Sequence, residues 1–211
     1  MTMPVVLVLA VVFIILCLAE LGWRRHWLRG ELGRKFVHIL VGTFVAFWPF
    51  FLTWNQIRLL SVAFLLVVII SKSLRVFQAI HSVERPTYGE LFFALIVGLL
   101  TFITHSKAVY AAALLQMSLA DGLAAIVGVH FGAKRGGAYK VFGHLKTPIG
   151  TATFFVVSAA ILLTYSLVGG NFAWPWVLLL AAGAAALENV AIAGLDNLLV
   201  PLFIASMLLW L

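Results

Sequence analysis

The sequence AVYAAALLQMSLA, residues 108–120, leads directly into DGLAAIVGVHFGAKRGGAYKVFGHLKTPIGT, residues 121–151. The first segment is apolar, whereas the second carries glycines, hydroxyls and basic side chains behind a single acid, Asp121. A carboxylate within an apolar segment is costly in a membrane and usually has a function there. Glycines let backbone N–H groups come close to a polyphosphate, and lysine or arginine neutralises its charge. The stretch therefore predicts phosphate chemistry at one face of a membrane.

The composition of the whole chain is that of a membrane protein. Of its 211 residues, 64% are hydrophobic and 10% are charged, against about 25% charged residues in a typical soluble domain. The N-terminus lacks the basic region and cleavage site of a secretory signal, so residues 4–22 are expected to be a retained span. The net charge of +7 indicates membrane topology and anionic lipid rather than nucleic acid, for which no motif is present. We predict a single integral membrane domain, residues 1–211.

Apolar runs separated by polar breaks predict the fold class, an all-α, polytopic bundle of about seven or eight transmembrane helices. A helix rises about 1.5 Å per residue, and the hydrocarbon core of a membrane is about 30 Å thick. The first six runs can cross it, while the last two are short and are expected to be tilted or broken. The runs span residues 4–22, 36–54, 57–71, 90–105, 107–129, 149–168, 174–187 and 198–211.

The basic residues predict the orientation of this multi-pass protein in a cell or internal membrane. Twelve of the fourteen lysines and arginines fall in three alternate loops, and only Arg58 and Lys107 fall elsewhere. Cytoplasmic loops are enriched in lysine and arginine, so these loops and the active site are expected on the cytoplasmic side and both termini outside. The twelve are Arg24, Arg25, Arg29, Arg34, Lys35, Lys72, Arg75, Arg85, Lys134, Arg135, Lys140 and Lys146.

Asp121 shares a predicted helix face with small residues. Ala124 or Ala125, Gly128 and Gly132 follow it at intervals of three or four residues. Small residues at this spacing let a second helix approach closely, so we interpret the glycines as a packing seam. No obvious basic partner lies one turn away from Asp121. We therefore interpret its carboxylate as a metal ligand or general base rather than as a buried structural hydrogen-bonding group.

The segment KTPIGT, residues 146–151, begins the next predicted helix. Pro148 suits the first helical turn, and Thr147 before it is a typical N-cap. A helix start presents N–H groups and positive partial charge to an anion, with Lys146 beside them. The spacing of a soluble phosphate-binding loop, G-x-x-x-x-G-K-[ST], is absent. The local pattern leaves two interpretations, a phosphate site that includes Gly150 and Thr151, or an ordinary capped helix with a lysine at the interface.

Two acid–asparagine pairs, Glu188-Asn189 and Asp196-Asn197, separate the two short apolar runs. Irregular backbone at membrane depth is tolerated where it lines a polar cavity. The runs are therefore expected either to tilt and extend through the acids or to be separated by a break between residues 188 and 197. Mg²⁺ prefers oxygen ligands and substrate phosphates, so the two carboxylates could complete a Mg²⁺ site with Asp121. A polar interfacial turn is the alternative.

Weaker polar clusters precede other predicted helices. Arg34 and His38 are four residues apart and share a face, with Lys35 alongside. Most basic residues of this chain only anchor helices at the cytoplasmic face, but His38 lies inside the apolar run. The second cluster consists of Arg85, Thr87, Gly89 and Glu90. The histidines at 130 and 144 lack the ligand spacing of a zinc site and are interpreted as loop residues.

Four segments together resemble the membrane lipid-alcohol kinases related to dolichol kinase, phytol kinase and CTP-dependent diacylglycerol kinase. This group shares ancestry with phosphatidate cytidylyltransferase. The segments are RKFVH (34–38), DGLAAIVG (121–128), KTPIGT (146–151), and EN at 188–189 with DNLLVP at 196–201. Their order and separation match across nearly the whole chain from Arg34 on, so the catalytic core is expected within residues 34–201. The C-terminal acids depart from the longer S-x-x-K-R signature of cytidylyltransferases, which favours the kinase.

The resemblance implies transfer of a γ-phosphoryl group from CTP or ATP to a lipid hydroxyl with Mg²⁺. The acceptor is expected to be a polyprenol, a phytol- or farnesol-like isoprenoid alcohol, or diacylglycerol. Asp121, Glu188 and Asp196 would hold Mg²⁺ or orient the hydroxyl, with Lys146 as a catalytic partner. The expected phosphate-binding residues are Arg34, Lys35, Lys134, Lys146, Thr147, Gly150 and Thr151. The expected supporting or lipid-contacting residues are His38, Glu90, Gly128, Gly132 and Asn197.

Two other functions stay open at this point. A cytidylyltransferase would join CMP to a lipid phosphate and release pyrophosphate. A membrane transporter would use Asp121 as an ion or proton site. A transporter is expected to have inverted repeats and polar residues at both faces, and this sequence shows neither clearly. The small-residue seam also leaves a homodimer open, because it can pack helices within one chain or between two.

Overall fold

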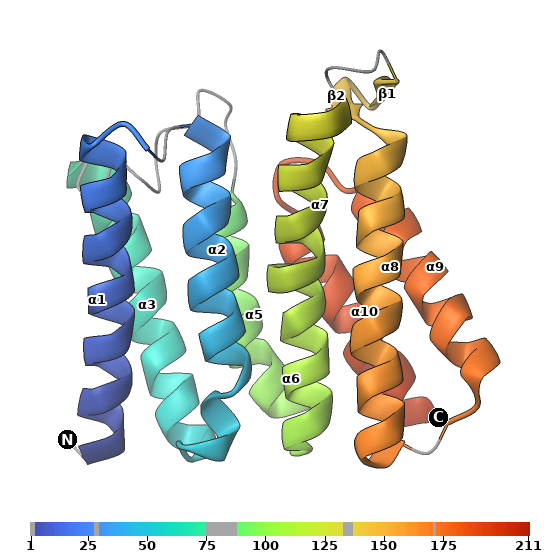
Figure 1. Ribbon diagram of the computed structural model, residues 1–211. Helices are drawn as coiled ribbons and strands as arrows, with labels where there is room; N and C mark the ends of the chain where they lie inside the picture. Colours follow the sequence, from blue (N-terminus) through green and yellow to red (C-terminus); the bar gives the residue numbers. More distant parts are fainter. Residues whose placement is uncertain (1–2, 28–29, 75–87, 133–136, 171) are drawn as a thin grey trace.

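The computed structural model describes residues 3–27, 30–74, 88–132, 137–170 and 172–211, and there the chain is a bundle of eight helical rods (Figure 1). This arrangement confirms the predicted all-α helical bundle. Three rods, Met3–Arg24, Lys107–Gly132 and Pro148–Gly169, are long and apolar enough to cross a membrane, and shorter apolar helices accompany them. The helices are α1 (Met3–Arg24), α2 (Gly30–Ala46), α3 (Trp54–Leu74), α5 (Gly89–Ile103), α6 (Lys107–Leu115), α7 (Asp121–Val127), α8 (Pro148–Tyr165), α9 (Trp174–Val190) and α10 (Asp196–Trp210).

The second predicted span, residues 36–54, is wrong at both ends. Helix α2 already begins at Gly30, which places Arg34 and Lys35 inside the helix rather than in the loop before it. It ends at Ala46 because Pro49 cannot continue an α-helix, and a short 3₁₀ turn, η1 (Trp48–Phe50), follows. Helix α3 then starts three residues earlier than predicted. Thr53 and Gln56 form a reciprocal capping box there, with backbone N–H to side-chain oxygen distances of 2.9 and 3.4 Å.

The rod that carries Asp121 contains two π-helical turns. The segment η2 (Gln116–Ala120) precedes α7 and η3 (Gly128–Gly132) follows it, so the helix is continuous from Lys107 to Gly132. Because the π turn contains an extra residue, the Asp121 N–H donates to the Gln116 carbonyl, five residues back. The second π turn includes His130, so the prediction that His130 is a loop residue is wrong. Single π turns inside α-helices are frequent at functional sites, and here one lies directly before Asp121.

Glycines set the distance between the helices around Asp121. A Cβ atom added to Gly122 would lie 2.2 Å from Ile39 Cγ1 on α2, and one added to Gly42 would lie 2.4 Å from Ser118 Cβ. On the other side, a Cβ at Gly132 would lie 2.4 Å from Thr147 Cγ2. Only glycine permits these approaches without displacing a neighbour. The predicted packing seam through Gly128 and Gly132 is thus confirmed, and it joins α7 and η3 to the start of α8.

A short antiparallel hairpin, β1 (Tyr139–Val141) and β2 (His144–Lys146), connects η3 to α8. Its two turn residues, Phe142 and Gly143, both have positive φ angles, 47° and 83°, as a tight two-residue hairpin turn requires. The hairpin lies at one end of the bundle, and both termini lie at the other (Figure 1). His144 is therefore a strand residue, not the loop residue that its sequence context indicates.

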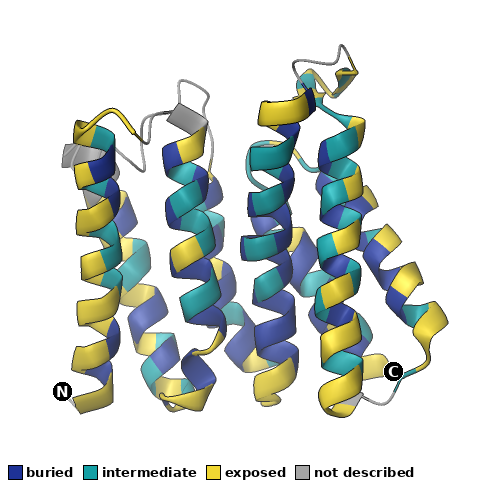
Figure 2. Ribbon diagram, viewed as in Figure 1, coloured by how far each residue is buried: buried dark blue, intermediate teal, exposed yellow. Residues whose placement is uncertain are grey.

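The bundle has a close-packed interior and an apolar exterior. Helix α10 packs against α5, α6 and α9, and Tyr110, Phe154 and Ile57 are among the largest fully buried side chains. Exposed apolar residues cover the outer side of α1, whose buried residues face the rest of the bundle (Figure 2). An outward apolar surface of this kind suits contact with lipid. Three acids from the otherwise apolar segments, Asp121, Glu188 and Asp196, lie instead near the hairpin.

Candidate active site

A cavity of about 440 Å³ lies near the hairpin end of the bundle, between α2, α7, the hairpin, the start of α8, and the connection from α9 to α10. It gathers residues that are up to 163 positions apart in the chain, from Arg34 to Asn197. Most of the residues predicted from the four sequence segments line it. These are Arg34, Lys35, Asp121, Gly128, Lys146, Thr147, Gly150, Thr151, Glu188, Asp196 and Asn197.

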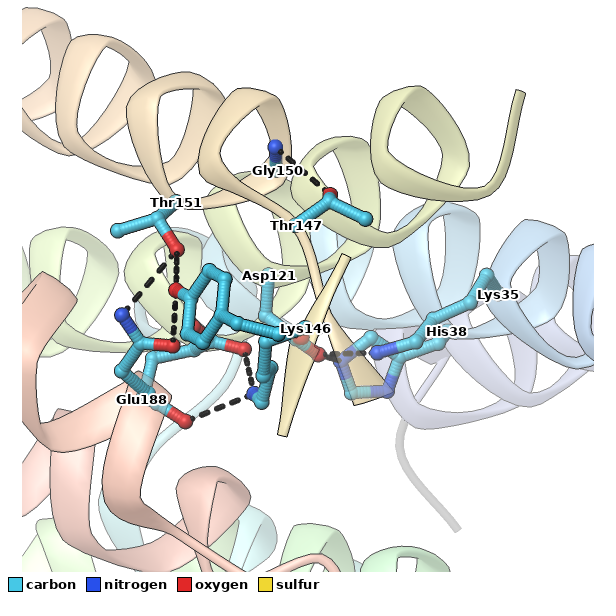
Figure 3. A network of polar contacts seen from close by, with 10 residues as sticks. Lys35, His38, Asp121, Lys146, Thr147, Gly150, Thr151 and Glu188 are labelled. Carbon is cyan, nitrogen blue, oxygen red and sulfur yellow. Dashed lines mark hydrogen bonds and ion pairs between the residues drawn. The ribbon is translucent and has the colours of Figure 1, made fainter. Parts of the chain in front are cut away.

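One wall of the cavity carries a buried ion pair. Lys35 Nζ on α2 donates to Asp121 Oδ2 on α7 at 2.5 Å, and the two residues are only 5% and 4% exposed (Figure 3). His38 lies one turn after Lys35, with its Nε2 3.6 Å from the same carboxylate oxygen and 2.9 Å from the Met117 carbonyl. A buried charge needs such a partner, because an isolated one loses its hydration without compensation. Asp121 thus has a basic partner that is adjacent in space, although none is adjacent in sequence.

A second pair closes the opposite wall. Lys146, at the end of β2, donates to the Glu188 carboxylate on α9 and also to the Glu188 backbone oxygen at 2.9 Å (Figure 3). The backbone oxygen belongs to the last turn of α9, where carbonyl groups have no partner within the helix. Lys146 is therefore held between the hairpin and α9, with its side chain partly buried beside the cavity.

The start of α8 has the predicted cap. Thr147 Oγ1 accepts a hydrogen bond from the Gly150 N–H at 3.2 Å, and Pro148 occupies the first turn. This use of the Gly150 amide, together with the absence of an N–H in Pro148, leaves the helix start with fewer amide donors for an anion than the pattern indicates. The positive charge beside it, on Lys146, is consequently the stronger feature for phosphate.

The connection between α9 and α10 forms the floor of the site. The sequence left open whether the helices extend through the acids or are separated by a break, and the structure shows both, since α9 continues to Val190, α10 begins at Asp196 and a break lies at residues 191–195. Ala193 and Gly194 in the break have φ angles of 54° and 90°. The Tyr88 N–H donates to the Ala193 carbonyl at 3.0 Å, which ties the break to the start of α5. Asp196 begins α10 and lines the cavity, and its carboxylate forms no hydrogen bond or ion pair with the described residues.

Asn197 holds an oxygen atom without a partner. Its Nδ2 donates to the Gly89 carbonyl at 2.9 Å, while its Oδ1 is buried and accepts no hydrogen bond from the part of the chain that the structure describes. The residue is 3% exposed and lines the cavity next to Asp196. A buried oxygen of this kind normally has a donor or a cation as its partner, because leaving it unsatisfied costs about 1–3 kcal/mol.

Some predicted residues lie outside the cavity wall. His38 contacts the site through Asp121, Gly132 packs against Thr147, and Glu90 lies in the first turn of α5 without lining the cavity. Lys134 lies outside the described residues. Among the described residues no group of three or more His, Cys, Asp and Glu side chains is close enough to hold a metal by itself, so the predicted Mg²⁺ site stays a prediction.

The charges of the cavity wall balance one another. Its lysine and arginine side chains equal its carboxylates in number, and two of the three carboxylates already contact a lysine. The charged lining residues are Arg34, Lys35, Lys146, Asp121, Glu188 and Asp196. A bound triphosphate would add about four negative charges to the cavity, and the residues of this wall alone would not neutralise them. A divalent cation that entered with the nucleotide would reduce the imbalance, as is usual for phosphoryl transfer.

Comparison with known proteins points to one chemistry. The chain is 36% identical over 194 residues to the phytol kinase of Synechocystis sp. (strain ATCC 27184 / PCC 6803 / Kazusa), and the match covers 87% of this chain and 81% of that protein. No protein-family model matches the chain, and no solved structure matches it.

Proposed function

The chain belongs to the phytol kinase family of lipid-alcohol kinases, and from this premise we propose that it transfers the γ-phosphoryl group of CTP or ATP to an isoprenoid alcohol such as phytol. The reaction would take place in the cavity at the hairpin end, on the cytoplasmic side of the membrane. The observation that carries the proposal is the convergence on one cavity of two lysine–carboxylate pairs and of Asp196, a carboxylate with no partner among the described residues. Phosphoryl transfer requires positioning and charge neutralisation, and these residues suit both tasks.

The phosphates would bind where the cationic side chains line the cavity. Lys146 and Arg34 lie on different elements, so together they can contact a triphosphate from two sides. Lys146 would exchange Glu188 for a phosphate oxygen, a substitution of one anionic partner for another. The Gly150 N–H is used for the cap, so Gly150 would shape the wall, whereas the Thr147 hydroxyl only accepts in that bond and its hydrogen can donate to a phosphate oxygen.

The oxygen atoms near the α9–α10 break fit a Mg²⁺ ion. Asp196 has no partner among the described residues, and the adjacent Asn197 Oδ1 is buried and unsatisfied. Mg²⁺ takes oxygen ligands, usually one or two carboxylates with water and substrate phosphates, so a three-carboxylate cluster is not required. Asp196 and Asn197 would hold the ion, with Glu188 and Asp121 on the neighbouring walls. When bound, Mg²⁺ would neutralise the β- and γ-phosphate oxygens.

Asp121 would act on the acceptor alcohol. Its carboxylate would accept the proton of the hydroxyl, whose oxygen forms a bond to the γ-phosphorus while the bond to the β-phosphate oxygen breaks. The nucleoside diphosphate then leaves, and the proton passes to solvent. Lys35 holds the carboxylate in place at 2.5 Å, and His38 contacts it from the same helix. The apolar tail of the alcohol would lie along the outer helices, in lipid.

The proposal is tested by a transfer assay on purified protein in detergent with Mg²⁺. CTP and ATP would be labelled separately at the α- and γ-phosphates, with phytol, farnesol, a longer polyprenol, diacylglycerol and phosphatidic acid as acceptors. We expect γ-label on phytol or another isoprenoid alcohol. Transfer of α-label to phosphatidic acid would show a cytidylyltransferase instead, and the absence of any transfer would contradict the proposal.

A further inference from the structure

The hydroxyl of Tyr139, the first residue of β1, belongs to a ring of hydrogen bonds that joins three elements. It donates to Asn189 Oδ1 on α9 at 2.8 Å and lies 2.8 Å from Thr151 Oγ1 on α8. Asn189 Nδ2 donates to the same Thr151 oxygen at 3.2 Å. The three side chains therefore contact one another pairwise, and each belongs to a different element of the site.

The donors in this ring can be assigned from the number of hydrogens. A hydroxyl carries one hydrogen, and that of Tyr139 is engaged with Asn189. The contact between Tyr139 and Thr151 must then use the Thr151 hydrogen. Each of the three groups donates once and accepts once around the ring. Hydrogen bonds arranged in this way polarise one another, which makes the ring stronger than three separate contacts.

The ring lies beside Lys146. Tyr139 and Lys146 are directly opposite each other in the hairpin, so their side chains lie on the same face. Asn189 follows Glu188 in α9. The hairpin thus docks on the last turn of α9 through two adjacent contacts, Tyr139 to Asn189 and Lys146 to Glu188.

The hairpin needs this docking, because two strands of three residues are not stable on their own. Its turn is exposed, with Phe142 75% accessible, so the turn does not hold it in place. If Lys146 exchanges the Glu188 carboxylate for a phosphate, the ion pair is lost and only its hydrogen bond to the Glu188 backbone oxygen can persist. The ring through Tyr139 is then a second, independent contact that keeps the hairpin on α8 and α9.

We propose that Tyr139 is a positioning residue: through Asn189 and Thr151 it holds the hairpin so that Lys146 can exchange Glu188 for the triphosphate without a loss of order. The inference rests on the proposed function. Nucleotide binding then does not have to order the hairpin, and the lysine stays within reach of the phosphate. Thr151 serves the hairpin in this arrangement, since its one hydrogen is engaged with Tyr139.

The first test measures the position of Lys146 without nucleotide or turnover. Tyr139→Phe removes one hydroxyl and keeps the aromatic ring, and Tyr165→Phe, on the far part of α8, is the matched control. An amine-reactive acylating reagent and hydrogen exchange, both read by mass spectrometry, would report on Lys146 and on the hairpin amides. We expect the acylation rate of Lys146 and the exchange rate of the hairpin amides to rise about tenfold in Tyr139→Phe, because this variant loses about one net hydrogen bond. Both rates should stay unchanged in the control. Wild-type rates in Tyr139→Phe would overturn the inference.

A second test asks whether Tyr139 acts through Lys146. In the wild-type background, Tyr139→Phe is expected to raise the KM for the nucleotide about tenfold with a smaller change in kcat. In a Lys146→Ala background it is expected to have no further effect, whereas an additive loss would show an independent role and contradict the inference. Thr151→Val should reproduce the effect and Thr151→Ser should not. If the wild-type protein transfers no phosphoryl group, the proposed function fails, and the labelling test still decides the position of Lys146.

Discussion

Lys146 binds Glu188 twice, through a 2.9 Å hydrogen bond to its backbone oxygen and through an ion pair with its carboxylate. The two contacts have different meanings. The backbone contact satisfies the end of a helix and does not depend on a ligand, because any donor at that position would serve. The ion pair depends on charge and competes directly with an anionic substrate. Lys146 therefore both satisfies the end of α9 and carries the positive charge that would attract an arriving triphosphate.

Replacement of Lys146 by glutamine separates these two contacts. Glutamine can still donate to the Glu188 carbonyl, but it lacks the positive charge, so we expect a folded protein with kcat/KM for the nucleotide lowered about 100-fold. Initial rates at varied nucleotide concentration would measure the loss. Lys140→Gln, an exposed lysine on the same hairpin, is the control and should stay near wild type. Retention of most activity by Lys146→Gln would remove Lys146 from the site.

Removing both charges of the Lys35–Asp121 pair is expected to preserve the stability of the protein but to abolish its activity. Lys35→Met leaves the buried Asp121 carboxylate without its partner, and we expect a loss of about 3–5 kcal/mol in the free energy of unfolding. The double variant Lys35→Met/Asp121→Leu removes both charges and should recover most of that stability.

Thermal unfolding in detergent would measure stability, and the transfer assay would measure activity. The double variant should be stable and inactive, and Asp121→Asn should fold with activity lowered at least 100-fold. A stable double variant that still transfers phosphate would show that the pair is only structural.

Asp196 should determine the Mg²⁺ requirement. Asp196→Asn keeps the shape of the side chain but removes its charge, so the Mg²⁺ concentration for half-maximal rate is expected to rise about tenfold or more. Asn197→Leu, which removes the unsatisfied oxygen, should shift it in the same direction. The control is Glu20→Gln, whose carboxylate pairs with Arg24 on α1, away from the cavity. An unchanged Mg²⁺ dependence in both cavity variants would exclude these residues as ligands.

The close approach of η3 to α8 makes Gly132 intolerant of a side chain. In Gly132→Ala the new Cβ would lie 2.4 Å from Thr147 Cγ2, so the Thr147 cap must move, and we expect a loss of about 1–3 kcal/mol in stability. Gly137→Ala is a suitable control, because among the described residues its Cβ would meet only Pro148 Cδ, at 3.9 Å. Equal melting temperatures for the two variants would contradict the packing seam.

Local patterns in the sequence predicted the parts of the site that depend on neighbouring residues. Thr147 and Pro148 identify the start of α8 because capping is decided within one turn. The break between Glu188 and Asp196 is marked by polar residues and Gly194, which the backbone conformation requires.

Contacts between distant residues were not accessible to the same reasoning. Lys35 and Asp121 are 86 positions apart, so the basic partner of Asp121 could be found only from the packing of α2 against α7. The hairpin was missed because each strand has three residues, too few for a periodic pattern. The role of Tyr139 depends on that hairpin, and a lone tyrosine in a basic loop carries no signal of its own.

The two termini lie at the same end of the bundle, on opposite sides of it and away from the hairpin (Figure 1). A reporter fused after Leu211 would therefore stand on the side of the membrane opposite the cavity. One accessibility measurement on such a fusion would fix the sidedness of the termini and of the chemistry together. A reporter outside the cell would mean that nucleotide reaches the cavity from the cytoplasmic pool. If the protein were immobilised through such a fusion, the entrance of the cavity would stay open to substrates during an assay.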